Sequence, residues 1–308
     1  MTAGWVAAST RGRALLARTI GADVASSIAA ADSWPSARDH LRNTIYGVEL
    51  PSTADRRCAR RSAATATAWQ LRVLAGWLPP ASSGLVRAFA APIEIANIQN
   101  HVAQLTTAAA PAPPIPLGTL SVAWAAVAKQ RSAEQVRAVL ARSPWGDPGG
   151  TDVSTVVLGL RVAWARRLAR QAPVAAAWAR GGAALLVARE RFAFDRAIPE
   201  VTGRELDRLL GTLWRHVSTT SELIDRLPKS VRWVFADVAT SEDLWLAEIT
   251  LLRRVSADGE RIATGARNGR NVLAAIMALL LVDLWRVDAA IETAGRTPLV
   301  TEVFDAVA

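Results

Sequence analysis

Hydrophobic positions recur with the period of an α-helix over most of this chain. The segment APIEIANIQNHVAQL, residues 91–105, is typical. Its apolar stripe consists of Ile95, Ile98, Val102 and Leu105. Glu94, Asn97 and His101 follow one another at helical spacing on a neighbouring face. No stretch shows sustained alternation of apolar and polar residues between hairpin turns, so strands are not supported. The pattern predicts an all-α protein.

Glu94 is the only charged residue between Arg87 and Lys129. A buried acid needs hydrogen bonds or a cationic partner, and Asn97 one turn later can orient it or bridge to a neighbouring helix end. One interpretation is structural, with Glu94 and Asn97 holding the local fold together. The other is functional, with direct contact to a partner protein. The residues alone leave both open.

Prolines and capping residues divide the helices. Breaks are predicted at Pro79-Pro80, at Pro92, at Pro111–Pro116 and in SPWGDPGG, residues 143–150. The stretch AAAPAPPIP, residues 108–116, is the best candidate for a linker, and a rigid one because proline fixes the backbone. Residues 132–135 and 219–222 have the spacing of a capping box, which predicts a helix start at each.

A short motif occurs twice at an offset of 99 positions. LRNTIYG, residues 41–47, is echoed by LARSPWG, residues 140–146. The copies follow the Ser-Ala pairs that begin at Ser36 and Ser132, and we expect each pair to open a helix. A poorer echo begins at Leu227 and precedes Trp233. Glycine permits a turn at a helix end, so Tyr46 and Trp145 are interpreted as aromatics that fold back over that end.

The acid motif also recurs. Glu94 has a counterpart 189 positions later in Asp283, and the polar residue one turn on is Asn97 in one copy and Arg286 in the other. A middle copy should fall near residue 189, where Glu190 lacks the accompanying Asn. We therefore predict three similar helical lobes, residues 1–107, 108–202 and 203–308, within one continuous domain.

Charge and chemistry narrow the functional classes. The 36 basic residues include only two lysines, and the net charge is +9. Such a balance is typical of solvated helix faces and also suits an acidic partner. There is no basic tail or interleaved aromatic platform, so nucleic acid is not an expected partner, although a basic helical nucleic-acid binder stays an alternative. One cysteine excludes an intrachain disulfide, and the three histidines lack metal-ligand spacing.

Catalytic motifs are not found, and no catalytic, cofactor or metal residue is predicted. Both lysines follow a residue other than glycine, which excludes a standard phosphate-binding loop. The most apolar run, residues 272–282, is too short for a bilayer, which needs about 20 residues. We expect that run to form a buried core helix. We also expect a cytoplasmic protein without a signal peptide.

Residues 11–50 and the segment IEIANIQNHV, residues 93–102, resemble the C subunit of bacterial and archaeal V/A-type rotary ATPases, which is similar to subunit d of eukaryotic V-ATPases. The resemblance implies a funnel of three lobes in a pseudo-threefold arrangement, without a catalytic site. It implies an adaptor for ion transport, proton or sodium, that seats the central rotor stalk on the membrane proteolipid ring. Membrane contact, at the inner face, would then run only through those partner subunits. A stand-alone helical scaffold or regulator is the other alternative.

Overall fold

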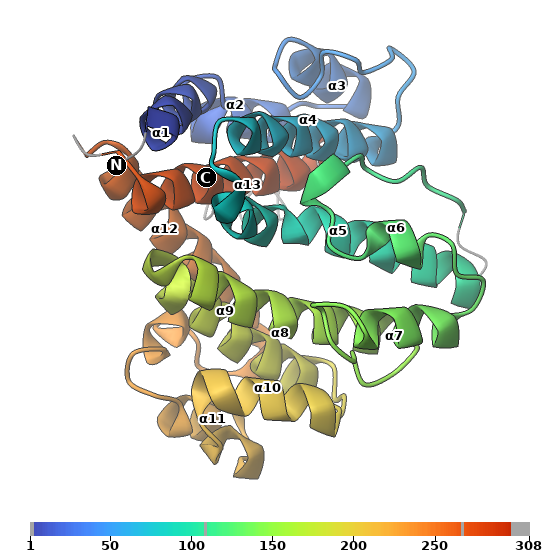
Figure 1. The fold of residues 1–308 in the computed structure, drawn as a ribbon, viewed down its shortest axis with the longest axis vertical. Helices are drawn as coiled ribbons and strands as arrows, with labels where there is room; N and C mark the ends of the chain where they lie inside the picture. The colour runs from blue at the N-terminus through green and yellow to red at the C-terminus, as the bar shows by residue number, and fades with distance from the viewer. Residues whose placement is uncertain (1–2, 108–109, 266–267, 297–308) are drawn as a thin grey trace. The chain divides into compact units, whose positions relative to one another are not determined.

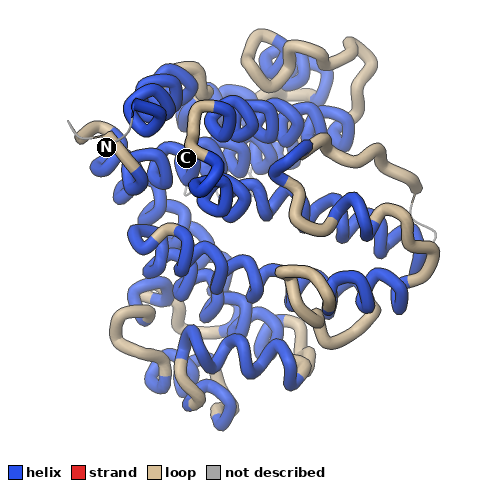
Figure 2. The backbone as a smooth tube through the Cα atoms, viewed as in Figure 1, coloured by secondary structure: helices blue, strands red, loops and turns tan. Residues whose placement is uncertain are grey.

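The computed structural model describes residues 3–107, 110–265 and 268–296. All regular structure in these ranges is helical, as Figure 2 shows, which confirms the all-α prediction. The described residues fall into two compact units. Unit 1 comprises residues 3–89, 115–117, 255–265 and 268–296, and unit 2 comprises 90–107, 110–114 and 118–254. Each unit is therefore assembled from segments that are far apart in the sequence.

Unit 1 is built around the last long helix of the chain. Its helices are α1 (Ala3–Leu16), α2 (Gly21–Ala29), α3 (Trp34–Arg42), α4 (Arg56–Gly76), the 3-10 turn η1 (Pro80–Ser82), the first turns of α5 (Ser83–Thr106), the end of α12 (Leu244–Ala263), and α13 (Arg270–Thr293). Figure 1 shows α13 running alongside α4, and α13 also packs against α1 and α2. The short helices of this unit thus share one central partner.

Unit 2 contains the remaining helices. They are the rest of α5, η2 (Gly118–Leu120), α6 (Trp124–Val127), α7 (Ala133–Ala141), α8 (Val153–Gln171), η3 (Pro173–Ala175), α9 (Ala176–Ala188), the π-helix η4 (Arg189–Ala193), α10 (Glu200–Leu210), η5 (Leu213–His216), α11 (Thr220–Arg226), η6 (Arg232–Phe235), η7 (Ser241–Asp243) and the start of α12. α8 packs against both α9 and α10.

Two predicted apolar segments form the cores. In unit 1, residues 272–282 of α13 are buried at nearly every position, as expected for a core helix. Leu273, Ile276 and Leu280 are 0% exposed, and burying each such side chain contributes up to about 1.5–3 kcal/mol. In unit 2, the predicted stripe of α5 lies in a core cluster with residues of α7 and α8. The apolar run of α13 and the helical period of α5 therefore each locate a core segment.

Pro92 does not break a helix, contrary to the prediction. It lies inside α5, which continues to Thr106. A proline in a helix interior forfeits one backbone hydrogen bond and crowds the preceding turn. Here the flanking residues Ala90, Ala91 and Ile93 are buried, so packing offsets that loss. The division between the two units falls shortly before this proline, between Phe89 and Ala90.

The three-lobe division stays a prediction. The two observed units have boundaries that differ from those of the predicted lobes. The proposed limit between residues 107 and 108 separates α5 from α6 and α7, yet all of these helices share unit 2 beyond Phe89. Likewise, α13 lies near the end of the chain but packs on α2, close to its beginning. The helix that carries Glu94, α5, thus shares a unit with short helices beyond the predicted boundary at residue 107. The helix that carries Asp283, α13, packs against a short helix near the beginning of the chain.

Candidate functional site

In unit 1, Asp283 of α13 holds the beginning of α2. The residue is 2% exposed. Its Oδ1 accepts a hydrogen bond from the Gly21 amide at 2.9 Å, and its Oδ2 accepts one from the Ile20 amide at 3.2 Å. The first amides of a helix have no hydrogen-bond partner within the helix. They also lie at the positive end of the helix dipole, where a carboxylate is favoured. Asp283 therefore caps α2 from a neighbouring helix.

Tyr46 completes this arrangement. Its side chain is 0% exposed, and its hydroxyl donates to Asp283 Oδ2. Burial raises the pKa of Tyr46 far above its ordinary value, and the negative charge of Asp283 raises it further. The phenol consequently stays protonated and acts as a donor. A single carboxylate thus joins α13, the start of α2 and the turn that follows α3.

In unit 2, Glu94 of α5 does the same for α6. It is 1% exposed. Its Oε1 accepts from three successive amides, those of Val122, Ala123 and Trp124, at 2.8, 2.7 and 2.8 Å. The same oxygen accepts from the Ser121 hydroxyl at 3.1 Å. This carboxylate is fully occupied by the fold, which favours the structural interpretation of Glu94.

The repeated turn motif has the same geometry in both units. The Thr44 hydroxyl donates to the Leu41 carbonyl at 2.7 Å, and the Ser143 hydroxyl donates to the Leu140 carbonyl at 2.7 Å. Each hydroxyl oxygen also accepts from the amide of the following aromatic, Tyr46 at 3.2 Å in one copy and Trp145 at 3.1 Å in the other. The sequence repeat is therefore a structural repeat.

The two glycines that end the motif are required for different reasons. Gly146 has a φ of +78°, in the left-handed region that favours glycine. At Gly47 the difficulty is space, since a Cβ there would lie 2.3 Å from the Leu41 carbonyl oxygen. The prediction that glycine permits the turn holds in both copies.

The helix that precedes the motif begins earlier than predicted in the first copy. Ser33, rather than Ser36, caps α3, because its hydroxyl accepts the Ser36 amide. In the second copy Ser132 caps α7, as predicted. Ser33 and Ser132 are themselves 99 positions apart, so the correction extends the repeat. The missed signal was Pro35, which follows Ser33 at a position that proline favours in the first turn of a helix.

Trp145 does not reproduce the role of Tyr46. It is 3% exposed, and its indole Nε1 has no hydrogen-bond partner among the described residues. The Arg167 guanidinium lies over its ring, 4.8 Å from the centroid. Trp145 is thus a packing residue, consistent with its interpretation from the sequence, but it is not linked to Glu94 by a hydrogen bond.

A third copy of the motif is partial. Thr219 caps α11 through the Glu222 amide, and Leu227 follows at the same distance as Leu41 and Leu140 follow their caps. The acid near residue 189, Glu190, pairs with Arg196 at 2.9 Å instead of capping a helix. The neighbouring Arg191 donates hydrogen bonds to the carbonyls of residues 214 and 217. Here a cation binds backbone oxygens where the other copies use an acid.

The polar residues one turn after the two acids are not equivalent. Asn97 is 2% exposed and lines a pocket beside α6. Arg286 donates to the Ser256 hydroxyl of α12 at 3.4 Å. The sequence analysis grouped them by position alone, and the structure gives them different surroundings.

In the described ranges, neither a metal-binding group nor a membrane-spanning helix accompanies these modules. They contain no group of three or more His, Cys, Asp or Glu residues placed to hold a metal ion. None of the helices that the structure describes combines the length and apolarity needed to cross a membrane. No model of a known protein family matches this sequence, and no curated protein matches it either.

Proposed function

We propose that this chain is a non-catalytic central-stalk adaptor of a V/A-type rotary ATPase, which seats the rotor shaft on the proteolipid ring and transmits torque for ion transport. The observation that supports the proposal most directly is the repeated module. In two copies a buried acid on a long helix caps a short helix, and the same hydroxyl-and-aromatic turn follows. The first turn, residues 41–47, and the acid Glu94 lie in the residues that carry the resemblance to the C subunit family, whereas Asp283 and the second turn, residues 140–146, lie outside them.

The capped module suits a part that carries mechanical load. A short helix held only by apolar contacts can slide along its neighbour, because hydrophobic burial has little directional preference. Charge-assisted hydrogen bonds to successive amides fix position and orientation together. Asp283 accepts such bonds from two successive amides, and Glu94 accepts them from three. A lobe built in this way resists shear between its helices.

We expect the chain to contact the proteolipid ring and the rotor stalk in different ways. The chain carries 34 arginines among its 36 basic residues, and each guanidinium offers a fork of donors that matches carboxylates of a partner. Association with the ring should therefore be peripheral and partly electrostatic, so that raised salt weakens it. The stalk contact should be more apolar and less sensitive to salt.

Co-purification from native membranes tests the proposal. A tagged chain is recovered at low and at high salt, and the bound proteins are identified by mass spectrometry. We expect ATPase stalk and ring subunits at low salt, with the ring subunits lost first as salt rises. Recovery of no ATPase subunit at any salt, although these subunits are expressed in the same cells, would contradict the proposal and favour a stand-alone scaffold.

A further inference from the structure

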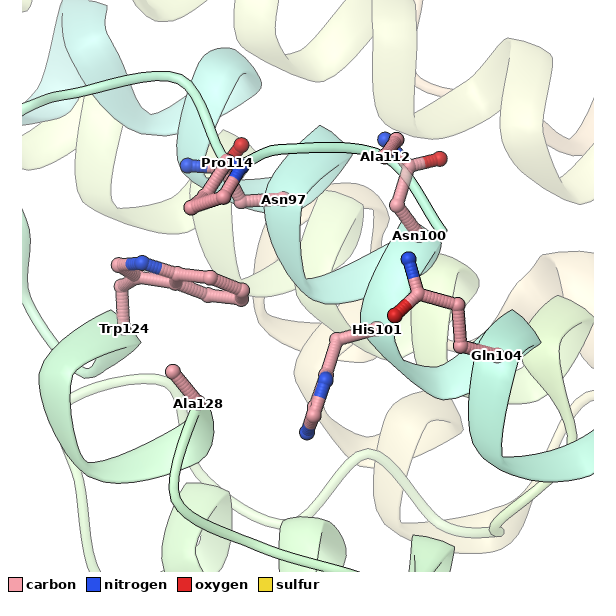
Figure 3. Close-up of a pocket in the computed structure, with 8 residues that line it drawn as sticks. All are labelled: Asn97, Asn100, His101, Gln104, Ala112, Pro114, Trp124 and Ala128. Atoms are coloured by element: carbon pink, nitrogen blue, oxygen red, sulfur yellow. The ribbon is translucent and has the colours of Figure 1, made fainter. Parts of the chain in front are cut away.

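Unit 2 contains a pocket that is lined by both polar and apolar side chains and by no Asp, Glu, Lys or Arg. Its volume is about 230 Å³. It is lined by Asn97, Asn100, His101, Gln104, Ala112, Pro114, Trp124 and Ala128. Figure 3 shows the Trp124 indole on one side of the pocket and the carboxamides of Asn100 and Gln104 on the other, with the His101 ring between them. The site thus combines one large aromatic surface with several neutral hydrogen-bonding groups.

Two carboxamides of the pocket, those of Asn100 and Gln104, are available to a ligand. Within the described part of the chain, the Asn100 and Gln104 carboxamides have no hydrogen-bond partner. His101 Nε2 lies 3.1 Å from the Gln130 carbonyl oxygen. A carbonyl only accepts, so Nε2 carries the hydrogen, and Nδ1 is an acceptor whenever the ring is neutral. The pocket therefore offers both donors and acceptors at its rim.

The aromatic wall is held in place by the module described above. Glu94 accepts the Trp124 amide at 2.8 Å, which fixes the backbone of that residue. The His101 ring meets the indole edge-on, with centroids 5.9 Å apart and planes at 86°. Such an edge-to-face contact is a preferred aromatic geometry and restrains both rings. The wall is therefore preorganised without a ligand.

The repeated architecture does not require these polar residues. Measured from the acid, the positions of Asn100, His101 and Gln104 correspond in α13 to Ala289, Ala290 and Thr293. Asp283 nevertheless caps α2 there as Glu94 caps α6. The carboxamides and the imidazole are thus an addition to one copy of a scaffold that folds without them. That asymmetry favours a role in binding over a role in folding.

We infer that this pocket binds a small, neutral, planar ring with a carbonyl acceptor and an N–H donor on one edge, such as a carboxamide-bearing heterocycle or a free nucleobase. The two carboxamides can share such an edge, one donating to its carbonyl and the other accepting from its N–H. The ring would stack on the indole of Trp124. A charged ligand is disfavoured because no Asp, Glu, Lys or Arg side chain lines the pocket to neutralise it. The inference is independent of the adaptor proposal.

Titration calorimetry with two probes and their charged counterparts tests the inference. The neutral probes are nicotinamide and uracil, and the matched anions are nicotinate and orotate, which differ by a carboxylate. We expect a neutral probe to bind with a dissociation constant on the order of 0.1–1 mM, as suits so few atoms. The matched anion should bind at least tenfold more weakly. Failure of both neutral probes to saturate the folded protein at 10 mM, or equal binding of the anions, would overturn the inference.

Variants locate the site and separate binding from folding. Gln104→Leu and Asn100→Leu should each raise the dissociation constant of the probe about fivefold to tenfold, because each removes one hydrogen bond. Gln99→Leu is the matched control on the same helix, since Gln99 does not line the pocket; it should leave binding unchanged. Equal affinities in all three variants, at unchanged thermal midpoints, would contradict the assignment. Binding of single-stranded oligo-uridine far tighter than that of uracil, and lost in the same two variants, would overturn the small-ligand identity.

Discussion

The carboxylates of Asp283 and Glu94 each cap a short helix, but they accept hydrogen bonds from different sets of donors. Asp283 binds two amides at the start of α2 and a hydroxyl from a separate turn, so it connects three segments of unit 1. Glu94 takes all its donors from residues 121–124, so it connects only two segments of unit 2. The comparison teaches that the module needs a buried acid but not a fixed set of donors. Its loss should therefore have unequal consequences in the two units.

The largest effect should come from Asp283→Ala. The change leaves the amides of Ile20 and Gly21 and the fully buried hydroxyl of Tyr46 without their acceptor, and we expect the free energy of unfolding of unit 1 to fall by about 3 kcal/mol. Urea unfolding followed by circular dichroism measures this loss. A midpoint within error of the wild type would show that the cap is dispensable.

Glu94→Ala should be milder, at about 2 kcal/mol, because a partial substitute remains. The Ser121 hydroxyl already accepts the Trp124 amide at 3.2 Å and can go on capping α6. Hydrogen exchange resolves the two units: the amides of residues 122–124 should lose protection in this variant, while those of residues 20 and 21 keep it. The reverse pattern would contradict the assignment of each acid to its helix.

A double-mutant cycle sharpens the contrast between the two aromatics. Tyr46→Phe combined with Asp283→Asn should show a coupling free energy of about 1–2 kcal/mol, because the two side chains share a buried hydrogen bond. The matched cycle, Trp145→Phe with Glu94→Gln, should couple by less than about 0.5 kcal/mol. Equal coupling in both cycles would mean that the copies work alike.

Sequence periodicity predicted the helical class and the apolar stripe of α5, because burial on one face repeats with the helix period. The buried run of α13 was predicted from its continuous apolar composition. The turn repeat was also visible, since Leu41, Thr44 and Gly47 each have a counterpart 99 positions on. The partners of the acids were not visible. Glu94 and Asp283 bind backbone amides, which every residue carries, so no residue type marks those donors in advance.

Asn97→Ala should lower stability by a smaller amount, about 1 kcal/mol, since the side chain is neutral and buried. Thermal unfolding checks this change, with Gln99→Ala as a partly buried control on the same helix. A stability unchanged from the wild type, together with weaker recovery of ATPase subunits, would favour the alternative in which Asn97 contacts a partner.

Two further effects should be pH-dependent and opposite in the two units. Burial raises the pKa of Asp288 to about 6, despite the opposing influence of Arg60. Its folded form binds a proton more tightly than the unfolded chain, so its contribution to stability is fully present below pH 3.8 and is lost as the pH rises through about 6. Asp288→Asn should therefore stabilise unit 1 at pH 8 and change little at pH 4, as measured by thermal midpoints.

Asp152 provides the counterpart in unit 2. Burial acts to raise its pKa, but hydrogen bonds from Ser154 and Thr155 outweigh burial and lower the pKa to about 2. Its contribution is present above pH 3.8 and is lost as the pH falls through about 2. Asp152→Asn should thus destabilise unit 2 at neutral pH. If both variants shift stability in the same direction at pH 8, the contrast between the units is wrong.

Asn97 and Arg286 mark where prediction from the sequence stopped. They occupy one position relative to the acids, yet Asn97 borders a pocket and Arg286 meets α12. The surroundings of such a side chain depend on which distant segments pack beside it. Helical spacing carries no information about those segments. The pocket could therefore be found only in three dimensions.

The most direct test of the adaptor proposal is ATP-driven ion transport in inverted membrane vesicles. Vesicles from cells that lack this chain should transport no ions on addition of ATP, and adding back the purified wild-type chain with the stalk and catalytic subunits should restore transport. The Asp283→Ala and Glu94→Ala chains should restore less, in that order of severity. Full transport in vesicles that lack the chain would contradict the account.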